Sequence, residues 1–351
     1  MEIKQKVIIS PLNWGLGHAA RCIPLINEFL NKNYEVILIG NGKSLAFLTS
    51  NFPDLKQYDI GGLEIEISAN KRGQTLSIAT QIPKFIRSKN LEFEKVSKII
   101  EEEKPHLIIS DNRYGVYSEK VKSILLTHQL KPRFPVLKGL FQNQLEKWML
   151  NFDEIWIPDS EKIMLSGRLS DIPSRLSKKV KHIGLLSHFT TAKKTNPENF
   201  EGFNLLLSGP EPQRSKLHEL ILNHEYFMDK NLNIFGNTKS LSKSKKHIEF
   251  GVISAIKMRP YLDSDSVVIC RSGYSSLMDL SYLGCKIILI PTPGQPEQVY
   301  LAKYISRKFN QLYITQRSLT QKRLDIFKNI EPLKFDEELF NEFQKFIKPA
   351  S

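Results

Sequence analysis

The sequence contains only three cysteines among 351 residues, Cys22, Cys270 and Cys285. None of them has the short spacing of a zinc-binding pair, and three thiols cannot build the disulfide framework of a small secreted domain. Cys270 and Cys285 lie in or beside apolar runs typical of buried strands. We therefore expect plain core thiols in a reducing cytoplasm.

Long apolar runs are missing as well. No stretch of about 18 uncharged apolar residues occurs, so we expect no membrane-spanning helix. Residues 1–7 carry charges and contain no apolar segment long enough for a secretion signal. With 41% apolar residues and 351 residues in all, the chain can nevertheless build the cores of two domains of ordinary size.

Acidic residues are outnumbered, 37 against 50 basic ones, which gives a net charge of +13. Such a charge fits a lysine-rich solvated surface, attraction to an anionic membrane face, or binding of nucleic acid. The lysines are scattered or sit in loops such as 178–181 and 243–246, and no nucleic-acid-binding module accompanies them. We rank the solvated surface first and the membrane second, and expect no nucleic-acid partner.

Apolar strands alternate with helical patterns along the whole chain, as in the β-loop-α-β units of a parallel sheet. After a polar stretch at 190–201, which we interpret as a loop near a domain boundary, the alternation starts again. The predicted fold class is α/β, with two Rossmann-like doubly wound domains, 1–185 and 186–351, facing across a cleft. Strands are expected at 7–10, 34–40, 107–110, 123–127, 154–158 (the last of the first half), 203–207, 232–235, 267–270 and 286–290.

The most informative stretch starts at the expected strand 267–270. The strand runs into Arg271-Ser272-Gly273-Tyr274-Ser275-Ser276, and Asp279 follows in the second turn of a helix. A Pro/Gly loop after strand 286–290 leads to a helix opened by Glu297-Gln298. Helix N-termini bind phosphate through free N–H groups, and a nearby carboxylate suits ribose hydroxyls. The pattern predicts a site for a nucleotide diphosphate.

These residues resemble the GT-B glycosyltransferases, most closely their family 28. The resemblance rests on Arg271-Ser272-Gly273, Asp279, Gly284 and Glu297-Gln298, and on Asn13-Trp14-Gly15-Leu16-Gly17-His18-Ala19-Ala20-Arg21 near the N-terminus. It implies a glycosyltransferase that uses a UDP-sugar, with UDP-N-acetylglucosamine as the expected donor. It also implies that the C-terminal half binds the donor and the N-terminal half the acceptor, with inversion at the sugar.

Two positions depart from the family pattern. In place of a Gly-Gly-Ser-type phosphate loop the chain has residues 208–214, whose two prolines remove N–H donors. Diphosphate contact there would rest on Ser208, Gly209 and Arg214. The paired glutamines of the family are replaced by Glu297-Gln298, closer to the acidic-Gln pair of plant-type sugar transferases.

The negative charge that develops on the departing diphosphate must be stabilised. We expect the backbone of 273–276 and the Ser275 and Ser276 hydroxyls to do this. A serine-capped helix would show the same pattern, because a cap and a phosphate site share geometry. Arg271 is expected to meet phosphate or to pair with a local carboxylate. The expected donor-binding residues are Ser208, Gly209, Arg271, Ser272, Gly273, Ser275, Ser276, Asp279, Gln295, Glu297 and Gln298.

The acceptor hydroxyl must lose its proton, and His18 is the expected base, because histidine titrates near neutrality and this one follows a Gly-rich loop at a strand end. Asp111 also follows a strand end and would orient His18 or replace it. Each acceptor-side residue taken singly also fits loop packing. The expected acceptor-binding residues are Asn13, Gly15, Gly17, Arg113, His128 and Gln129.

Asp263-Ser264-Asp265 resembles a metal-binding Asp-X-Asp, but it precedes its strand and so lies away from the ligand-binding edge. We expect a turn there, and no metal or other cofactor. Apolar residues from Phe134 to Met149 recur at helical spacing, which favours a core helix slightly over a membrane-surface segment. If the acceptor is lipid-linked, residues 131–150 are the segment through which we expect the protein to contact an anionic bilayer.

Two other functions stay open at this point. A UDP-sugar epimerase could use the same scaffold without an acceptor, with His18 or Asp111 abstracting a ring proton. A non-enzymatic nucleic-acid-binding module would use the positive charge and show a steep salt dependence. The acceptor and the oligomeric state are not readable from the sequence.

Overall fold

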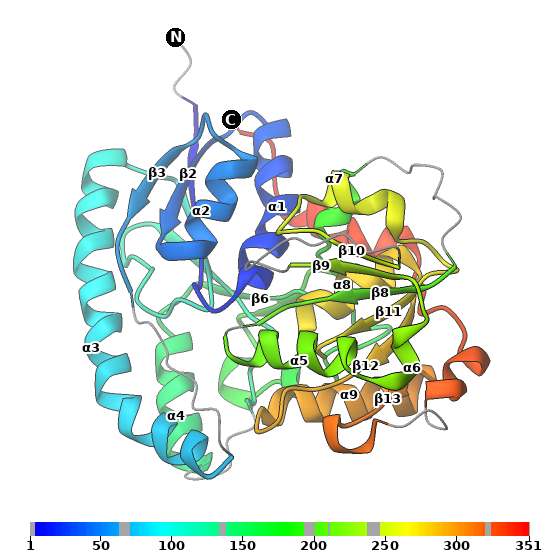
Figure 1. The fold of residues 1–351 in the computed structure, drawn as a ribbon. Coiled ribbons are helices and arrows are strands. Elements are labelled where there is room, and N and C mark those ends of the chain that lie inside the picture. The colour runs from blue at the N-terminus through cyan, green and yellow to red at the C-terminus, as the bar shows by residue number, and fades with distance from the viewer. Residues whose placement is uncertain are drawn as a thin grey trace. The chain divides into compact units, whose positions relative to one another are not determined.

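The computed structural model describes residues 4–62, 71–132, 138–192, 201–209, 211–236, 246–319 and 324–350. The chain divides into two compact units, Met1–Leu186 together with Glu338–Ser351, and Ser187–Glu337. Each unit is an α/β domain (Figure 1). The first division falls one residue beyond the expected boundary at 185. The expectation that residues 338–351 belong to the second domain is wrong.

The first unit contains, within its described residues, a seven-stranded sheet of order β3-β2-β1-β4-β5-β6-β7 in which all pairs are parallel. Its central strand β1 is apolar and buried from Val7 to Ile9, as expected for a strand covered on both faces. The strand at 154–158 is not the last one, because β7 pairs beyond it. The strands are β1 Lys6–Pro11, β2 Glu35–Gly40, β3 Lys56–Asp59, β4 Leu107–Asp111, β5 Lys122–Leu126, β6 Glu154–Ile157 and β7 Val180–His182.

Helices of the first unit follow the predicted crossovers. In α1 the apolar side chains Cys22, Leu25, Ile26 and Phe29 are buried at helical spacing. Figure 1 shows α3 as the longest helix of this unit. The helices are α1 Leu16–Asn31, α2 Gly42–Asn51, α3 Lys71–Glu103 and α4 Lys138–Met149, with short 3-10 turns at Gly167–Ser170 and Ser174–Leu176.

The core interpretation of α4 holds for its described apolar side chains. Trp148 packs with its ring centroid 5.4 Å from that of Phe85 and 5.9 Å from that of Tyr114, and Leu145 and Met149 are buried beside it. Lys131 and Lys147 remain exposed. Phe134 and Leu137, at the start of this pattern, lie outside the described residues. Membrane contact through 131–150 stays a prediction, and buried apolar side chains do not favour it.

The C-terminal segment packs on the first unit through main-chain contacts. The Leu185 N–H donates to Leu339 O at 2.7 Å, and Lys32 Nζ donates to Gln344 O at 2.9 Å and also to Ile347 O. The segment forms 3-10 turns at Glu337–Phe340 and Glu342–Phe346. These contacts join positions more than 150 residues apart, so local pattern could not reveal them.

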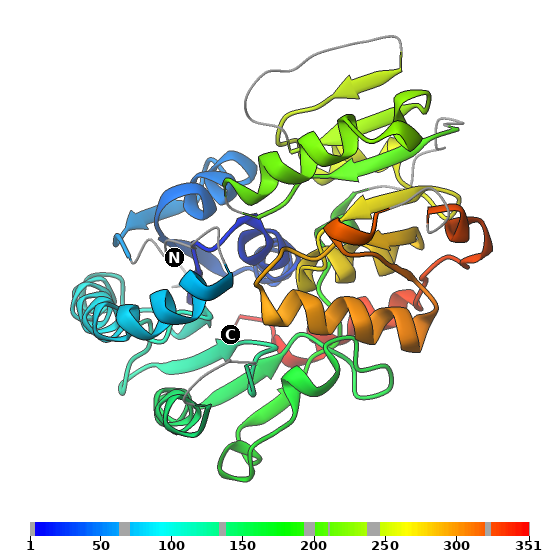
Figure 2. The same cartoon turned by 60° about the horizontal axis from the view of Figure 1, so that its bottom comes forward.

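The second unit contains, in its described part, a six-stranded parallel sheet of order β10-β9-β8-β11-β12-β13. Figure 2 gives a second view of its strands and helices. The strands are β8 Phe203–Leu206, β9 Leu232–Phe235, β10 His247–Glu249, β11 Val267–Cys270, β12 Lys286–Leu289 and β13 Leu312–Tyr313. The helices are α5 Gln213–Leu222, α6 Glu225–Met228, α7 Ala255–Met258, α8 Tyr274–Leu283 and α9 Pro296–Phe309, with 3-10 turns at His188–Thr191, Arg259–Tyr261, Gln316–Ser318 and Asp325–Asn329. Of the expected loop 190–201 and the lysine loop 243–246, residues 193–200 and 243–245 lie outside the described residues.

Both sheets have a point where the strand order reverses, between β1 and β4 in the first and between β8 and β11 in the second. Ligands of open α/β sheets bind outside the carboxyl ends of the strands at such a point. The loops that leave β1, β4, β8 and β11 are therefore where a site is expected. No helix in the described part of the chain combines the length and the apolar character needed to cross a bilayer.

Candidate active site

The first reversal point brings His18 and Asp111 together. Asp111 is the last residue of β4, and the register places it beside Pro11 at the end of β1. The loop after β1 then returns as α1, whose first turn carries His18. His18 Nδ1 lies 3.0 Å from Asp111 Oδ1, although the residues are 93 positions apart. The two expected catalytic residues thus form a hydrogen-bonded pair.

Asp111 is a buried carboxylate, and Arg21 decides its charge. Burial alone would favour the neutral acid, but the charge of Arg21, and after it that of His18, lowers the pKa of Asp111 to about 2. Arg21 Nε donates to Asp111 Oδ2 at 2.7 Å, and Nη2 donates to Oδ1. A carboxylate so firmly ionised and so fully bonded is a poor base. Of its two expected roles, Asp111 retains the orienting one.

Sequence reasoning missed Arg21 as a site residue. It lies three residues after His18, one turn along the same face of α1, and is only 2% exposed. Its Nη2 lies 3.0 Å from His18 Nδ1, and its Nη1 lies 3.2 Å from His128 Nδ1. A buried position for a charged residue in an apolar helix face was the available signal, because such a charge requires a partner.

Most of the other expected acceptor-binding residues also lie near the end of β1 or after β5. Asn13 Oδ1 accepts from the Ser44 N–H at 3.2 Å and so caps the start of α2, which gives Asn13 a structural role. His128 is buried against Arg21, and its Nε2 lies 3.5 Å from Gln129 Nε2. Gly15, the N-cap of α1, has φ +86° and open space around the position of a Cβ, whereas Gly17 lies within the first turn.

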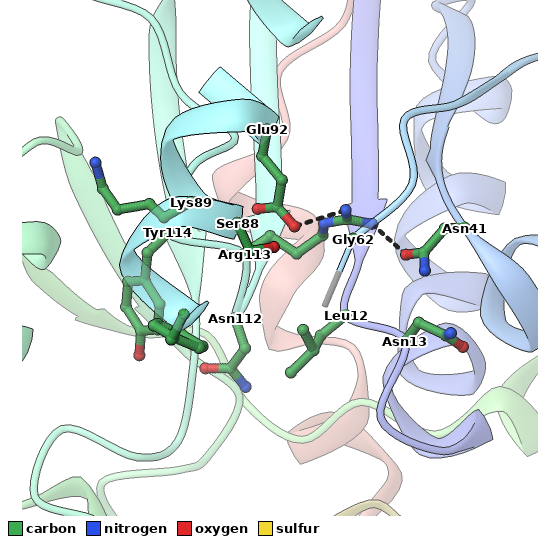
Figure 3. Close-up of a pocket in the computed structure, with 11 residues that line it drawn as sticks. Leu12, Asn13, Asn41, Gly62, Ser88, Lys89, Glu92, Asn112, Arg113 and Tyr114 are labelled. Carbon is green, nitrogen blue, oxygen red and sulfur yellow. Dashed lines mark hydrogen bonds and ion pairs between the residues drawn. The ribbon is translucent and has the colours of Figure 1, made fainter. Parts of the chain in front are cut away.

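Arg113 lines a pocket at the carboxyl ends of β1, β2 and β4 (Figure 3). Its Nη1 donates to Asn41 Oδ1 at 3.0 Å, and its Nη2 donates to Gly61 O and Glu92 Oε1 at 2.8 Å each. Burial raises the pKa of Glu92, and the charge of Arg113 offsets this only in part. Figure 3 shows Lys89 pointing away from the guanidinium. Arg113 therefore ties three segments together and forms a pocket wall. The pocket is lined by Leu12, Asn13, Asn41, Gly62, Phe85, Ser88, Lys89, Glu92, Asn112, Arg113 and Tyr114.

In the second unit Arg271 lies beneath the reversal point and is 1% exposed. Its Nη1 donates to Ile290 O at 3.0 Å and to Pro291 O at 3.3 Å, and its Nη2 donates to Gln213 O at 2.8 Å. Main-chain carbonyls, and not the expected local carboxylate, accept these hydrogen bonds, while contact with phosphate stays a prediction. Burial lowers the pKa of Arg271 to about 10, so the group stays charged at neutral pH. No carboxylate of the described residues pairs with it.

Ser272 and Gln298 hold the loops of this edge to one another. Ser272 is fully buried and its Oγ donates to Gln298 O at 2.7 Å, while Gln298 Oε1 accepts from the Thr292 N–H at 2.8 Å. Donor contact of Ser272 stays a prediction, and it is not favoured by a hydroxyl that is bonded to the main chain. Gln295 is the N-cap residue of α9, and Glu297 is in the first turn.

The first turn of α8 carries two serines, and its N-cap residue is a glycine. Gly273 is its N-cap residue, no acidic residue lies in the first turn, and a Cβ on Gly273 would meet only Ser276 Oγ at 3.9 Å. Ser275 and Ser276 are half-buried in that turn. Asp279 Oδ1 accepts from Ser187 Oγ at 2.7 Å and lies 3.1 Å from His188 Nδ1. Asp279 Oδ2 has no partner among the described residues.

In the loop after β8 Gly209 is exposed, and the charges of Glu211 and Arg214 neutralise each other. Gly209 has φ +87° and is exposed, with Ser208 half-buried before it, and Pro210 lies outside the described residues. Glu211 Oε1 accepts from Arg214 Nε and Nη2 at 3.0 Å each, and Oε2 accepts from the Ser215 N–H at 3.1 Å. Arg214, which we expected at the diphosphate, is thus paired with Glu211.

Asp263 forms the turn that we expected before β11. Its Oδ1 accepts from the N–H groups of Asp265 and Ser266, at 3.0 and 2.9 Å. Among the described residues there is no group of three or more His, Cys, Asp or Glu that could hold a metal ion.

Comparisons with known proteins match both units of this chain. The model of the glycosyltransferase family 28 C-terminal domain matches residues 213–345, which include α5, β11, α8 and α9. A UDP-N-acetylglucosamine--N-acetylmuramyl-(pentapeptide) pyrophosphoryl-undecaprenol N-acetylglucosamine transferase of Caldicellulosiruptor saccharolyticus is 22% identical over 347 residues, covering 92% of this chain and 88% of that protein.

Solved structures show the same fold over nearly the whole chain. Spinosyn rhamnosyltransferase SpnG, complexed with thymidine diphosphate, aligns with a TM-score of 0.63 at 10% identity and covers 97% of this chain and 96% of its own. Acinetobacter baumannii MurG aligns with a TM-score of 0.51 at 11% identity, covering 99% and 96%. These matches show the GT-B fold, with its two parallel α/β units. The match to the family 28 C-terminal domain and the curated relatives show that the chain is a glycosyltransferase. Residues 213–345 match the C-terminal domain of glycosyltransferase family 28, and the curated relatives support the resemblance of the chain to that family.

Proposed function

We propose that this glycosyltransferase moves N-acetylglucosamine from UDP-N-acetylglucosamine to the hydroxyl of a lipid-linked acceptor, with inversion and without a required metal ion. The donor and the acceptor class come from the names of its curated relatives. The observation that carries the mechanism is the pairing of His18 Nδ1 with the ionised Asp111 at 3.0 Å. The protein would work in the cytoplasm, in peripheral contact with the membrane that holds such an acceptor.

The first unit would supply the proton chemistry. A proton on His18 Nδ1 donates to Asp111 and leaves Nε2 as the lone pair that accepts a proton. The acceptor oxygen then forms a bond to the anomeric carbon, and its proton passes to His18 Nε2. The bond from that carbon to the phosphate oxygen breaks, and the diphosphate leaves with the electron pair. General-base catalysis of this kind contributes about 100-fold or more to the rate.

The second unit would stabilise the departing diphosphate. The first turn of α8 offers main-chain N–H groups and the Ser276 hydroxyl, and the positive end of the helix dipole acts in the same direction. Arg271 adds a buried positive charge that no described carboxylate neutralises. These groups supply what a divalent cation would otherwise supply, which is the reason to propose metal independence. Turnover that survives EDTA would support that part, and turnover that requires Mg²⁺ would refute it.

Asp279 would bind a ribose hydroxyl through its Oδ2. Asp279→Asn keeps an acceptor oxygen for Ser187 and replaces the other carboxylate oxygen by a donor. We expect the affinity for UDP, measured by calorimetry, to fall at least about tenfold, as for a lost hydrogen bond to a charged group. Asp265→Asn, on the turn before β11, is the matched control and should keep the wild-type affinity. Equal affinity of the two variants would remove Asp279 from the donor site.

The base is tested separately from the donor. His18→Ala should leave UDP affinity unchanged and reduce turnover about 100-fold or more. Turnover is measured as UDP release from UDP-N-acetylglucosamine with a short-chain pyrophosphoryl-prenol N-acetylmuramyl-pentapeptide as acceptor. Near-normal turnover of the variant would eliminate His18 as the base. Formation of an epimer when the acceptor is left out would instead favour the epimerase.

A further inference from the structure

Arg21 is the buried centre of the cluster at the first reversal point. It contacts both oxygens of Asp111, lies 3.0 Å from His18 Nδ1 and 3.2 Å from His128 Nδ1. Three different segments meet there: α1, the end of β4 and the loop after β5. A guanidinium is planar, permanently charged and carries five N–H donors, so it can fix all of these groups at once.

The contacts of Arg21 restrict where the neighbouring protons can be. An arginine nitrogen always donates, and an imidazole nitrogen accepts only when it carries no proton. A hydrogen bond from Arg21 Nη1 to His128 Nδ1, which lies 3.2 Å away, requires that this nitrogen carry no proton. His18 Nδ1 has two neighbours at 3.0 Å with opposite requirements, the acceptor Asp111 Oδ1 and the donor Arg21 Nη2.

This competition bears directly on the base. A proton on His18 Nδ1 satisfies Asp111 and leaves Nε2 free to take a proton. A lone carboxylate at this distance would also favour a second proton on the ring, which would remove the base. Arg21 and Asp111 together carry no net charge. The carboxylate can therefore orient the ring while the guanidinium opposes its protonation.

Other titratable groups around the pair come from each packed element. Cys22 on α1 has its Sγ 3.9 Å from Asp111 Oδ2, and burial raises the pKa of this thiol well above its usual range. Burial, and after it the negative charge of Asp111, raises the pKa of Tyr114. Neither is charged near neutrality. His128 Nδ1 lies 3.2 Å from Arg21 Nη1. Arg21 and Asp111 are therefore the charges that act on His18.

We propose that Arg21 is a positioning residue for the transfer reaction: it fixes Asp111 through both carboxylate oxygens and keeps His18 in the neutral form that can act as base. The inference rests on the proposed role of His18. Its test therefore includes a measurement on His18 itself that needs neither acceptor nor turnover.

The measurement is the titration of His18 followed by NMR of protein labelled with 15N at its eight histidines. The His18→Ala variant identifies the His18 signals by their absence. In Arg21→Met the titration midpoint of His18 should move upward by about one pH unit or more, because a cation is removed and Asp111 stays. In Arg21→Lys, which keeps the charge, it should move by less than half of that shift. Arg168→Met, at an exposed arginine of the same unit, is the matched control.

Kinetics gives the second readout. The acidic limb of the pH dependence of kcat/KM should shift upward in Arg21→Met in parallel with the NMR midpoint, with UDP affinity unchanged. A merely structural role would lower activity by the same factor at every pH. An unmoved or lowered His18 midpoint in Arg21→Met would overturn the proposal.

Arg21→Met leaves a buried carboxylate alone, so it can fail to fold. Arg21→Met/Asp111→Asn removes both charges and then decides. If Arg21 acts through Asp111, the double variant has the turnover of Asp111→Asn within about twofold, because the two effects are not additive. A further tenfold loss would contradict the proposal. If His18→Ala itself keeps normal turnover, the proposed function fails at the base, and the titration still reports on Arg21.

Discussion

The bond between Asp111 and Arg21 should dominate the stability of the first unit. Asp111→Asn keeps the size of the side chain but leaves the Arg21 guanidinium, 2% exposed, without its anionic partner. Breaking a buried pair on one side costs about 3–5 kcal/mol. The lowered pKa of Asp111 gives a second value for this free energy. A pKa of about 3.9 in the unfolded chain and of about 2 in the folded protein corresponds to about 2.5 kcal/mol of stability. We expect a loss of about 2.5–5 kcal/mol.

Tryptophan fluorescence isolates this effect. The three tryptophans of the chain, Trp14, Trp148 and Trp156, all lie in the first unit, and the last two are buried. Urea unfolding followed by tryptophan emission therefore reports the first unit and not the second. Asp171→Asn is the matched control, since its partner Arg168 is 79% exposed and such pairs contribute less than about 1 kcal/mol.

The same pair predicts a pH dependence with a definite sign. Because folding lowers the pKa of Asp111, its contribution is complete above the unfolded-state pKa near about 3.9 and is lost as the pH falls towards about 2. The stability difference between wild type and Asp111→Asn should be constant from pH 5 to 7. It should shrink to about half of its value near pH 3.

Two results would refute this reasoning. One is an Asp111→Asn unfolding free energy within about 1 kcal/mol of wild type, because the buried pair would then contribute no more than an exposed one. The other is a difference that grows as the pH falls, since that requires a carboxylate whose pKa is raised by folding.

Two further substitutions test the anchors of the fold. Gly184→Ala should destabilise the first unit by more than about 2 kcal/mol and expose residues 338–351 to proteolysis, because Gly184 has φ +81° and a Cβ would lie 2.4 Å from Leu339 O; a cleavage rate equal to that of wild type would contradict this. Arg271→Met should cost the second unit about 2–4 kcal/mol through three lost carbonyl contacts, seen as faster amide exchange in β11 and β12. Arg317→Met, at an exposed arginine, should leave that exchange unchanged.

The sequence was sufficient to predict the inner strands of both sheets and to bring His18 near Asp111, whereas the outer strands β3, β7, β10 and β13 were not predicted. Both residues follow apolar runs, and the carboxyl ends of adjacent parallel strands meet at one edge, so strand ends alone predicted their proximity. The family 28 resemblance likewise rested on residues that follow the end of a strand, here β11 in the second unit. There the residues 271–279 connect a buried strand to a helix, and the pattern gives the position of the helix start directly.

Partners that are far apart in sequence or that lie on the main chain could not be predicted. Arg271 was expected at a phosphate or a local carboxylate because its type fits both, but its three acceptors in the structure are carbonyls of the loop after β12 and of the first residue of α5, 19 to 58 residues away along the chain. The carboxylate that binds Arg21 lies 90 positions further on, so no local pattern could identify it. The return of residues 338–351 to α1 likewise depends on tertiary contacts that no local periodicity encodes.

The two reversal points use polar groups in opposite ways, and this has a consequence for mechanism. At the first, ionisable side chains contact one another, so protons there respond to a substituted neighbour. At the second, a buried cation and a serine are bonded to main-chain carbonyls, so the charge near α8 is fixed by the backbone and does not titrate near neutrality. Removing a proton from an acceptor requires the first kind of site, and stabilising a permanently anionic leaving group requires the second. The pH dependence of the chemical step should therefore arise in the first unit, and the contribution of Arg271 to UDP affinity should stay constant across the pH range in which turnover changes.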